Sequence, residues 1–213
     1  MEIELYLYNV LVRWGHILVG IAWIGLLYYF NFVQTEYVKV ADPDAKADVM
    51  KKLAPNALWW FRWAALFTFL TGVILLYQIW ARIGTEIILG ATMGTLMMLN
   101  VWGIIWRNQK IVLGMKEGDV ALAAAKAGLA SRTNTLFSVP MLMYMVYSAH
   151  APGSYLVLDD WNMTSLLIGL VIIFAIEANA IWGKMLPVIA SVTSVITSSF
   201  VLAVVLKIIT DTL

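Results

Sequence analysis

The stretch from Arg13 to Gln34 most constrains what this chain can fold into, because it is apolar enough to cross a bilayer and still carries polar side chains. On a helix that advances about 100° per residue, steps of three and four residues return to the same face. Such steps connect Arg13, His16, Gly20, Trp23, Leu27, Asn31 and Gln34. Lipid cannot satisfy polar groups, so this stripe is predicted to face protein or a cavity.

The composition of the whole chain also indicates a membrane protein. Its 213 residues are 62% hydrophobic and only 13% charged, which leaves too little polar surface for a soluble domain of this size. The formal net charge of +1 gives no reason to expect a nucleic-acid partner. The absence of cysteine excludes disulfides, iron–sulfur clusters, thiolate metal sites and covalently attached c-type haem.

Six apolar segments approach or exceed the length of about 20 residues that a membrane-spanning helix needs. They cover residues 8–33, 56–80, 84–106, 133–150, 161–183 and 188–209. Between the third and fourth segments, residues 119–130 are predicted to form a separate short helix at the membrane interface. We therefore expect one all-α transmembrane domain over residues 1–213, a polytopic integral membrane helical bundle of about six transmembrane helices surrounded by lipid.

Basic residues are distributed unevenly between the two sides of the predicted bundle. One side carries Lys39, Lys46, Lys51, Lys52, Arg62, Arg107, Lys110, Lys116, Lys126, Arg132 and Lys184, and the other carries Arg13, Arg82 and Lys207. Short loops rich in Lys and Arg stay in the cytoplasm. Both termini are therefore predicted to lie on the outer side of the membrane.

The two histidines, His16 and His150, are predicted to lie in the same outer half of the membrane. His16 lies roughly 10 Å inside its segment at 1.5 Å per residue, and His150 ends the fourth segment. Two imidazoles at similar depth are candidate ligands for the iron of one haem b, and Gly20 would leave room for the flat macrocycle. The alternative is that both histidines are structural.

A second polar group is predicted in the inner half of the bundle. By the helical rise, Glu177 lies about 24 Å from the outer end of its segment, at a depth shared with Arg62. A carboxylate there is costly unless paired, so we predict an Arg62–Glu177 pair and take both as candidate catalytic residues. The candidate substrate-binding residues are Asn31, Trp59, Asn100, Trp102, Asn108 and Arg132. These residue types suit a small planar anion or a quinone, and a purely structural ion pair is the alternative.

Four stretches resemble the membrane domain of the bacterial membrane-bound, cytochrome c-linked urate oxidases (urate hydroxylases): HILVGIAWIGLLYYFNFVQ, ALWWFRWAALFTFLTG, GTLMMLNVWGIIWRNQK and ASRTNTLFSVPML. The resemblance covers the chain from Arg13 to about Trp182. It implies a multi-pass protein of the bacterial cytoplasmic membrane that oxidises urate to 5-hydroxyisourate and passes electrons through haem b. The sequence has no CxxCH motif, so we expect the C-terminal cytochrome c domain of that family to be lacking here. The expected electron acceptor is therefore a separate cytochrome c or a larger respiratory complex.

Other functions fit parts of the same pattern. The main alternative is a b-type cytochrome or accessory membrane subunit of a respiratory electron-transfer complex, without catalysis of its own. Membrane protoporphyrinogen oxidases also have a first-helix histidine before Trp and Gly, but they require a lysine in a later helix. Here the later lysines, Lys184 and Lys207, lie at helix ends. No pair of broken helices indicates a transporter.

Overall fold

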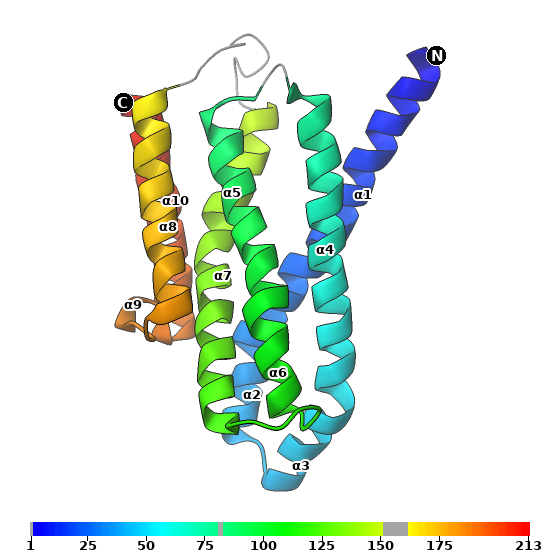
Figure 1. Cartoon of the computed structure of the whole chain (residues 1–213), viewed down its shortest axis with the longest axis vertical. Coiled ribbons are helices and arrows are strands. Elements are labelled where there is room, and N and C mark those ends of the chain that lie inside the picture. The colour runs from blue at the N-terminus through cyan, green and yellow to red at the C-terminus, as the bar shows by residue number, and fades with distance from the viewer. Residues whose placement is uncertain (1, 81–82, 151–161) are drawn as a thin grey trace.

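The structure, a computed structural model, describes residues 2–80, 83–150 and 162–213. Every secondary-structure element in these ranges is a helix, which confirms the predicted all-α fold. Figure 1 shows the helices side by side as one elongated bundle. Arg82, one of the three basic residues predicted on the outer side, lies outside the described residues.

Three helices of the bundle are continuous but change winding along their length. The first joins α1 (Glu2–Tyr28), the π-helical η1 (Tyr29–Gln34) and α2 (Thr35–Val40). The second joins α3 (Pro43–Asp48), η2 (Val49–Leu53) and α4 (Ala54–Gln78). The third joins α5 (Thr85–Asn100), η4 (Val101–Ile105) and α6 (Trp106–Val112). They are followed by α7 (Val120–His150), α8 (Met163–Trp182), the short α9 (Pro187–Ala190) and α10 (Val192–Thr212).

Five helical segments in the described ranges are long and apolar enough to cross a membrane: Tyr6–Val40, Pro43–Gln78, Thr85–Val112, Met163–Trp182 and Val192–Thr212. The remaining predicted span, residues 133–150, is the second part of α7, a helix of 31 residues. The predicted separate helix over residues 119–130 is wrong, because these residues begin α7 without a break. Their alanine-rich sequence favours helix, and the single glycine, Gly128, is tolerated inside it.

Figure 1 shows both chain termini at one end of the bundle, with the α2–α3 and α6–α7 connections at the other end. The predicted topology requires this arrangement, since it puts both termini on one side of the membrane and the loops rich in Lys and Arg, which contain these two connections, on the other. Which end faces the cytoplasm stays a prediction. The first half of α1 leans away from the other helices towards the N-terminus.

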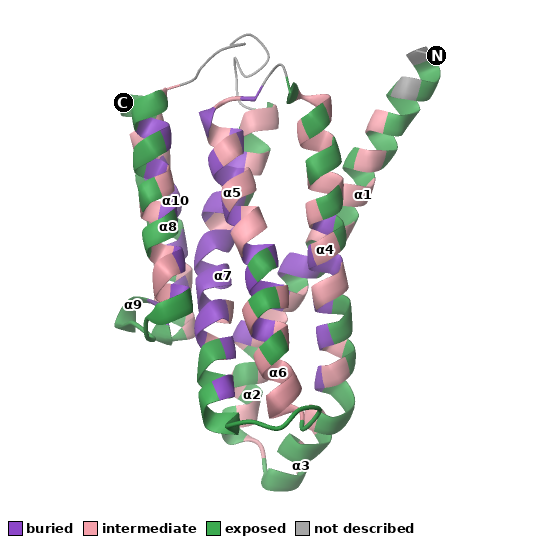
Figure 2. Cartoon of the chain, in the orientation of Figure 1, coloured by how far each residue is buried: buried purple, intermediate pink, exposed green. Residues whose placement is uncertain are grey.

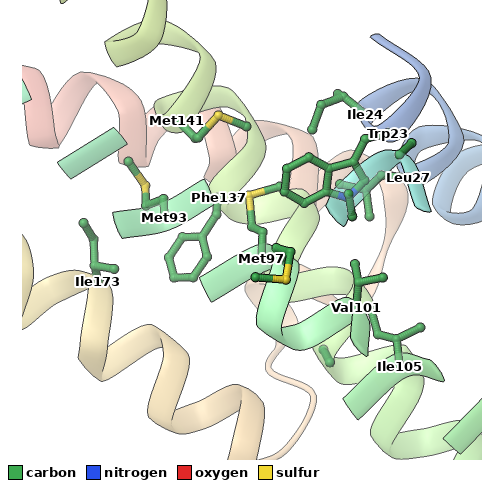
Figure 3. Packing of buried hydrophobic residues seen from close by; sticks show 14 of the residues in the cluster. Trp23, Ile24, Leu27, Met93, Met97, Val101, Ile105, Phe137, Met141 and Ile173 are labelled. Atoms are coloured by element: carbon green, nitrogen blue, oxygen red, sulfur yellow. The ribbon is translucent and has the colours of Figure 1, made fainter. Parts of the chain in front are cut away.

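The hydrophobic core draws on α1, α4, α5, α7 and α8. Its fully buried members include Trp23, Leu27, Met93, Met97, Phe137 and Ile173, which Figure 3 shows packed together. Trp23 and Leu27 belong to the predicted stripe of α1, and so does the buried Asn31. The stripe is therefore confirmed as the packing face of this helix, except that Arg13 is exposed.

Gly90 allows α5 and α7 to approach each other closely. A Cβ atom added at Gly90 would lie 3.1 Å from the Cβ atom of Tyr144 and 3.6 Å from the carbonyl oxygen of Met141. Membrane helices commonly use small residues for such contacts, because lipid offers no hydrophobic driving force between them. The α5–α7 contact is thus the tight seam that aligns the polar residues described below.

Pro140 lies buried inside α7 and ties this helix to α10. Proline has no N–H, so the carbonyl of Leu136, four residues earlier, lacks its usual helical donor. The Ser199 hydroxyl of α10 supplies one, with its Oγ 2.7 Å from the Leu136 carbonyl oxygen. Exposed carbonyls cannot be left in lipid. The α7–α10 contact therefore completes the hydrogen bonding of α7.

Candidate functional site

The longest polar run inside the bundle is on α7, from Ser131 to Ser138. Arg132, Thr133, Asn134, Thr135 and Ser138 are all buried, with exposed fractions between 0% and 5%. Figure 2 shows this part of α7 as an almost continuous buried stretch. Different faces of α7 pack on α1, α5, α8 and α10, so the partners of these polar residues come from several helices.

One face of the run joins α5 and α8 through three residues that we call the amide–carboxyl cluster: Asn100, Asn134 and Glu177. The Nδ2 atom of Asn100 donates to Oδ1 of Asn134 and to Oε2 of Glu177, each at 3.0 Å. Nδ2 of Asn134 donates to the Met97 carbonyl oxygen at 2.9 Å. The three side chains are 1%, 0% and 6% exposed. They form a buried polar centre where three helices meet.

The predicted ion pair between Arg62 and Glu177 is wrong. Among the described residues, Glu177 bonds to the Asn100 amide, and no salt bridge joins it to Arg62. Arg62 instead lies against Trp106, with its Cζ 3.9 Å from the ring centroid. Its backbone carbonyl accepts a hydrogen bond from Nε1 of Trp102 at 3.0 Å. Trp102 follows Asn100 by two residues, about 200° around a helix, so Arg62 and Glu177 lie on opposite sides of it.

Arg62 belongs to an arginine–tryptophan cluster, which comprises Arg62, Trp59, Trp63, Trp102 and Trp106. The ring centroid of Trp63 lies 5.4 Å from that of Trp102 and 6.2 Å from that of Trp59. Trp59 is 44% exposed, so this cluster reaches the surface of the bundle. Nη1 of Arg62 is buried and has no hydrogen-bond partner. The cluster thus combines a cation that retains hydrogen-bonding capacity with accessible aromatic faces.

Asn31 joins α7 on a third side. It lies in the π-helical segment η1 and is 4% exposed. Its Nδ2 donates to Oγ of Ser131 at 2.8 Å and to the Leu27 carbonyl oxygen at 2.9 Å. Asn100 directly precedes another π-helical segment, η4. Such segments occur frequently at functional sites. Here η1 contains Asn31 and η4 follows Asn100, and both asparagine side chains bond to α7.

Two other predicted substrate-binding residues do not join the amide–carboxyl cluster. Asn108 donates its Nδ2 to the carbonyl of Ile104 in its own helix, at 2.8 Å. Arg132 precedes Asn134 by two residues, so it points to nearly the opposite side of α7. It is 5% exposed and its Nη1 has no hydrogen-bond partner. The predicted inner pocket is therefore divided by helices α5 and α7 into separate polar sites.

His16 packs against α4. Its Nδ1 lies 2.9 Å from Oγ1 of Thr71. A Cβ atom added at Gly72 would lie 3.2 Å from Cε1 of His16, and one added at Gly20 would lie 3.9 Å from Cγ2 of Thr68. Gly72 therefore lets α4 approach the His16 ring closely, and α4 is in ordinary van der Waals range of the position beside Gly20.

His150 is the exposed last residue of α7. Figure 1 shows α4 between the outer part of α1 and the end of α7. One hollow, of about 260 Å³, is lined by residues of α5 and α8 and by neither histidine. Within the described ranges, no three His, Asp or Glu side chains are grouped as a metal site. Haem b with His16 and His150 as its iron ligands stays a prediction.

The sequence predictions missed Asn134 and Tyr28. Asn134 completes the amide–carboxyl cluster, and the Tyr28 hydroxyl lies 2.9 Å from Oγ of Ser138. The available signal was the SRTNT sequence at residues 131–135, five consecutive polar residues that continue into an apolar segment. Such a run inside a membrane bundle indicates a helix with protein on several sides.

A comparison with known protein families matches residues 76–207, more than half of the chain, to the family described as urate oxidase N-terminal. The matched region contains Asn100, Trp102, Asn108, Arg132, Asn134, His150 and Glu177, whereas His16, Gly20, Asn31, Trp59 and Arg62 precede it. No match to the chain was found among curated proteins or among solved structures. The chain belongs to the urate oxidase N-terminal family.

Proposed function

We propose that this protein oxidises urate, or a similar planar anion, within the half of the bundle that contains the amide–carboxyl cluster. The family match supports a relationship to urate oxidation. The observation that carries the proposal is Glu177, a buried carboxyl group whose partner is an amide and not a cation. An ionisable group inside a membrane bundle is costly, and such groups mark functional sites by default.

The proposed reaction converts urate and water into 5-hydroxyisourate, two protons and two electrons. Glu177 is the group that accepts a proton from the reacting molecules, as a general base. Asn100 holds Oε2 of this carboxyl group at 3.0 Å, while Oε1 has no hydrogen-bond partner among the described residues. Asn134 fixes the Asn100 amide, because it is itself anchored to the Met97 carbonyl.

Recognition of the anion is assigned to the arginine–tryptophan cluster. A guanidinium group and indole rings suit a flat, oxygen-rich anion, because they combine charge, hydrogen-bond donors and stacking surfaces. Arg62 and Glu177 lie on opposite sides of one helix, so they do not contact the same small molecule in this arrangement. We propose that Arg62 first attracts the anion at the surface and that Glu177 acts on it within the bundle.

The two electrons require an acceptor, which we propose to be a separate cytochrome c or a larger respiratory complex. A haem b held by His16 and His150 would supply one-electron transfer toward that acceptor. A reduced-minus-oxidised visible spectrum of the purified protein tests for haem b. If the b-type band is present in wild type and absent in His16→Ala, the iron ligand is His16.

The experiment that tests the proposed function measures urate consumption and cytochrome c reduction by the purified protein in lipid. Glu177→Gln keeps an acceptor for Asn100 but removes the base, so turnover should fall by a factor of about 100 or more. The matched control is Glu117→Gln, an exposed acid in the α6–α7 connection. Wild-type turnover in Glu177→Gln would remove Glu177 from the mechanism. Absence of urate-dependent reduction in wild type would favour the accessory-subunit function.

A binding assay distinguishes urate from a quinone as the planar ligand. Arg62→Leu should lose urate binding, whereas the control Arg107→Leu, at an exposed position on α6, should retain it. Equal urate affinity in wild type and Arg62→Leu would exclude the arginine–tryptophan cluster as the recognition site. Quinone binding without urate binding in wild type would instead indicate an electron-transfer subunit.

A further inference from the structure

Arg132 is a buried cation that the proposed reaction does not use. Its side chain is 5% exposed, and Nη1 is buried without a hydrogen-bond partner. A guanidinium group carries five N–H donors, yet no hydrogen bond or ion pair joins Arg132 to any residue in the described ranges. Removing a charge from water without compensation costs several kcal/mol.

The neighbouring polar residues of α7 show that this lack of partners is local. Ser131, Asn134, Thr135 and Ser138 all have hydrogen-bond partners. Thr133, next to Arg132, is 1% exposed and its Oγ1 also has no partner. Two consecutive buried side chains of an otherwise satisfied helix therefore keep unused donors.

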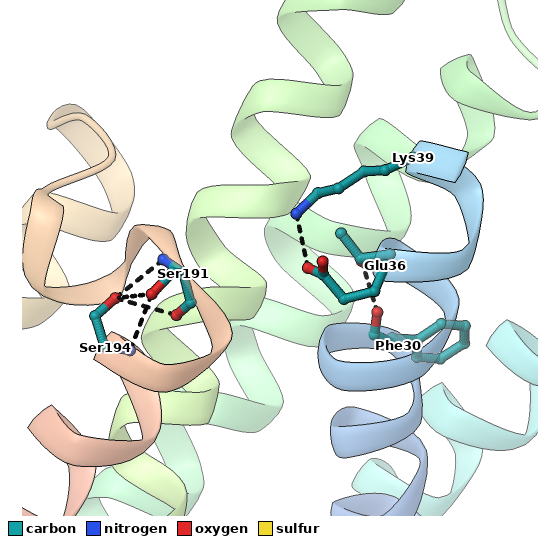
Figure 4. Close-up of polar contacts among 6 residues, drawn as sticks. Phe30, Glu36, Lys39, Ser191 and Ser194 are labelled. Carbon is teal, nitrogen blue, oxygen red and sulfur yellow. Dashed lines mark hydrogen bonds and ion pairs between the residues drawn. The ribbon is translucent and has the colours of Figure 1, made fainter. Parts of the chain in front are cut away.

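The side chains around Arg132 are apolar, and no acidic side chain of the described residues forms an ion pair with it. Leu129 and Leu136 lie three and four residues away on its face of α7, in a cluster with Ile189 and Phe32. Glu36 of α2 forms its ion pair with Lys39, with Oε1 2.7 Å from Nζ at the surface. Figure 4 shows this pair on one side of α7 and the beginning of α10 on the other.

We propose that Arg132, with the Thr133 hydroxyl, binds an oxyanion between α7 and the helices on this side of it, as a site separate from Glu177. The ligand is a carboxylate or phosphate group, because the planar guanidinium fork matches two oxygens of such a group. A free small anion and the headgroup of an anionic lipid share this chemistry. This site does not depend on whether the protein oxidises urate.

The test is the thermal stability of the full chain in nanodiscs, followed by tryptophan fluorescence. One arm uses zwitterionic lipid and adds inorganic phosphate, with sodium chloride as the ionic-strength control. The other arm replaces part of the lipid with phosphatidylglycerol in phosphate-free buffer. A ligand that binds only the folded state stabilises it by RT ln(1 + L/Kd), where L is the free ligand concentration, so the Tm keeps rising with the logarithm of L above Kd. Arg132→Met is compared with Arg107→Met, which removes an exposed arginine from α6.

The expected result is a rise in Tm in at least one arm for wild type and Arg107→Met, and no rise for Arg132→Met. A rise with phosphate identifies a free anion as a ligand, and a rise with phosphatidylglycerol identifies a lipid. Equal changes in Tm for wild type and Arg132→Met in both arms would overturn the proposal.

Should Arg132→Met fail to fold, Arg132→Lys keeps the charge and removes the fork. The ligand should then bind at least about tenfold more weakly, a tenfold change in affinity being the loss of about 1.4 kcal/mol. Native mass spectrometry of wild type provides a second measurement, which should show a retained phosphate or anionic lipid. Equal retention in wild type and Arg132→Lys would contradict a site built on the guanidinium group.

Discussion

Helix α7 buries polar side chains, whereas the first half of α1 exposes apolar ones. Between Arg132 and Ser138, α7 buries polar residues that are 0% to 5% exposed. The first half of α1 presents large apolar residues outward, such as Leu11, Trp14 and Ile17, which are more than half exposed. A membrane provides an apolar solvent, so apolar surface can remain outside while polar groups need protein partners.

This difference explains why composition identifies α1 more readily than α7. Apolarity measures how well a helix tolerates lipid, and the α1 segment is among the five that meet the criterion for a span. Helix α7 does not meet it, although it packs on α1, α5, α8 and α10. In this chain the helix with the longest run of buried polar residues is therefore one that the search for apolar segments does not identify.

The largest expected effect comes from the amide–carboxyl cluster. Asn100→Leu removes the donor to both Asn134 and Glu177, so two buried acceptors lose their partner. The free energy of unfolding should fall by about 2–4 kcal/mol. The control is Leu18→Ala in α1, where the side chain is 52% exposed and the change should stay within about 0.5 kcal/mol. Chemical unfolding in detergent measures the free energy of unfolding of both variants. Similar losses for Asn100→Leu and Leu18→Ala would contradict the contrast between the buried polar centre and the exposed face of α1.

An intermediate effect is expected from glycine substitutions on the two helices. Gly90→Ala places a methyl group 3.1 Å from Cβ of Tyr144, so α5 and α7 must separate slightly, at about 1–3 kcal/mol. Gly15→Ala in α1 meets nothing within 4 Å. It should be neutral or stabilise the helix by up to about 1 kcal/mol. Thermal unfolding of the two variants compares them, and a stable Gly90→Ala protein would argue against a tight α5–α7 seam.

The smallest effect is expected where α10 completes α7. Ser199→Ala removes the donor to the Leu136 carbonyl and should cost about 0.5–1.5 kcal/mol. In a Pro140→Ala background, the restored N–H of residue 140 can donate to the Leu136 carbonyl. Ser199→Ala should then lower the free energy of unfolding by less. A double-mutant cycle measures this coupling. Additive losses would show that Ser199 does not compensate for Pro140.

The sequence predicted the parts of the fold that depend on distance along a helix. The polar stripe of α1 is its packing face from His16 to Gln34, with Asn31 bonded to Ser131 of α7. Helical spacing alone determines such a face. Asn100 and Glu177 were both predicted as members of one polar group, and these residues do meet.

The predictions were wrong where angular position around a helix decides the contact. Arg62 and Glu177 were paired because they share a depth, but depth does not specify the direction of a side chain. The partner of Glu177 is Asn100, and Arg62 lies on Trp106. Single-sequence reasoning had no information on how the helices rotate about their axes. The same reason explains the separation of Arg132 from the amide–carboxyl cluster.

The contact between Ser199 and the Leu136 carbonyl has a consequence for biosynthesis. A segment that leaves the ribosome partitions into the bilayer according to its own apolarity, and a charged side chain such as that of arginine opposes this. Helix α7 carries Arg132 and a proline-induced gap in its backbone bonding. The residue that closes this gap is synthesised 63 positions later. Helix α7 therefore reaches its final bonded state only after α10 has entered the membrane beside it.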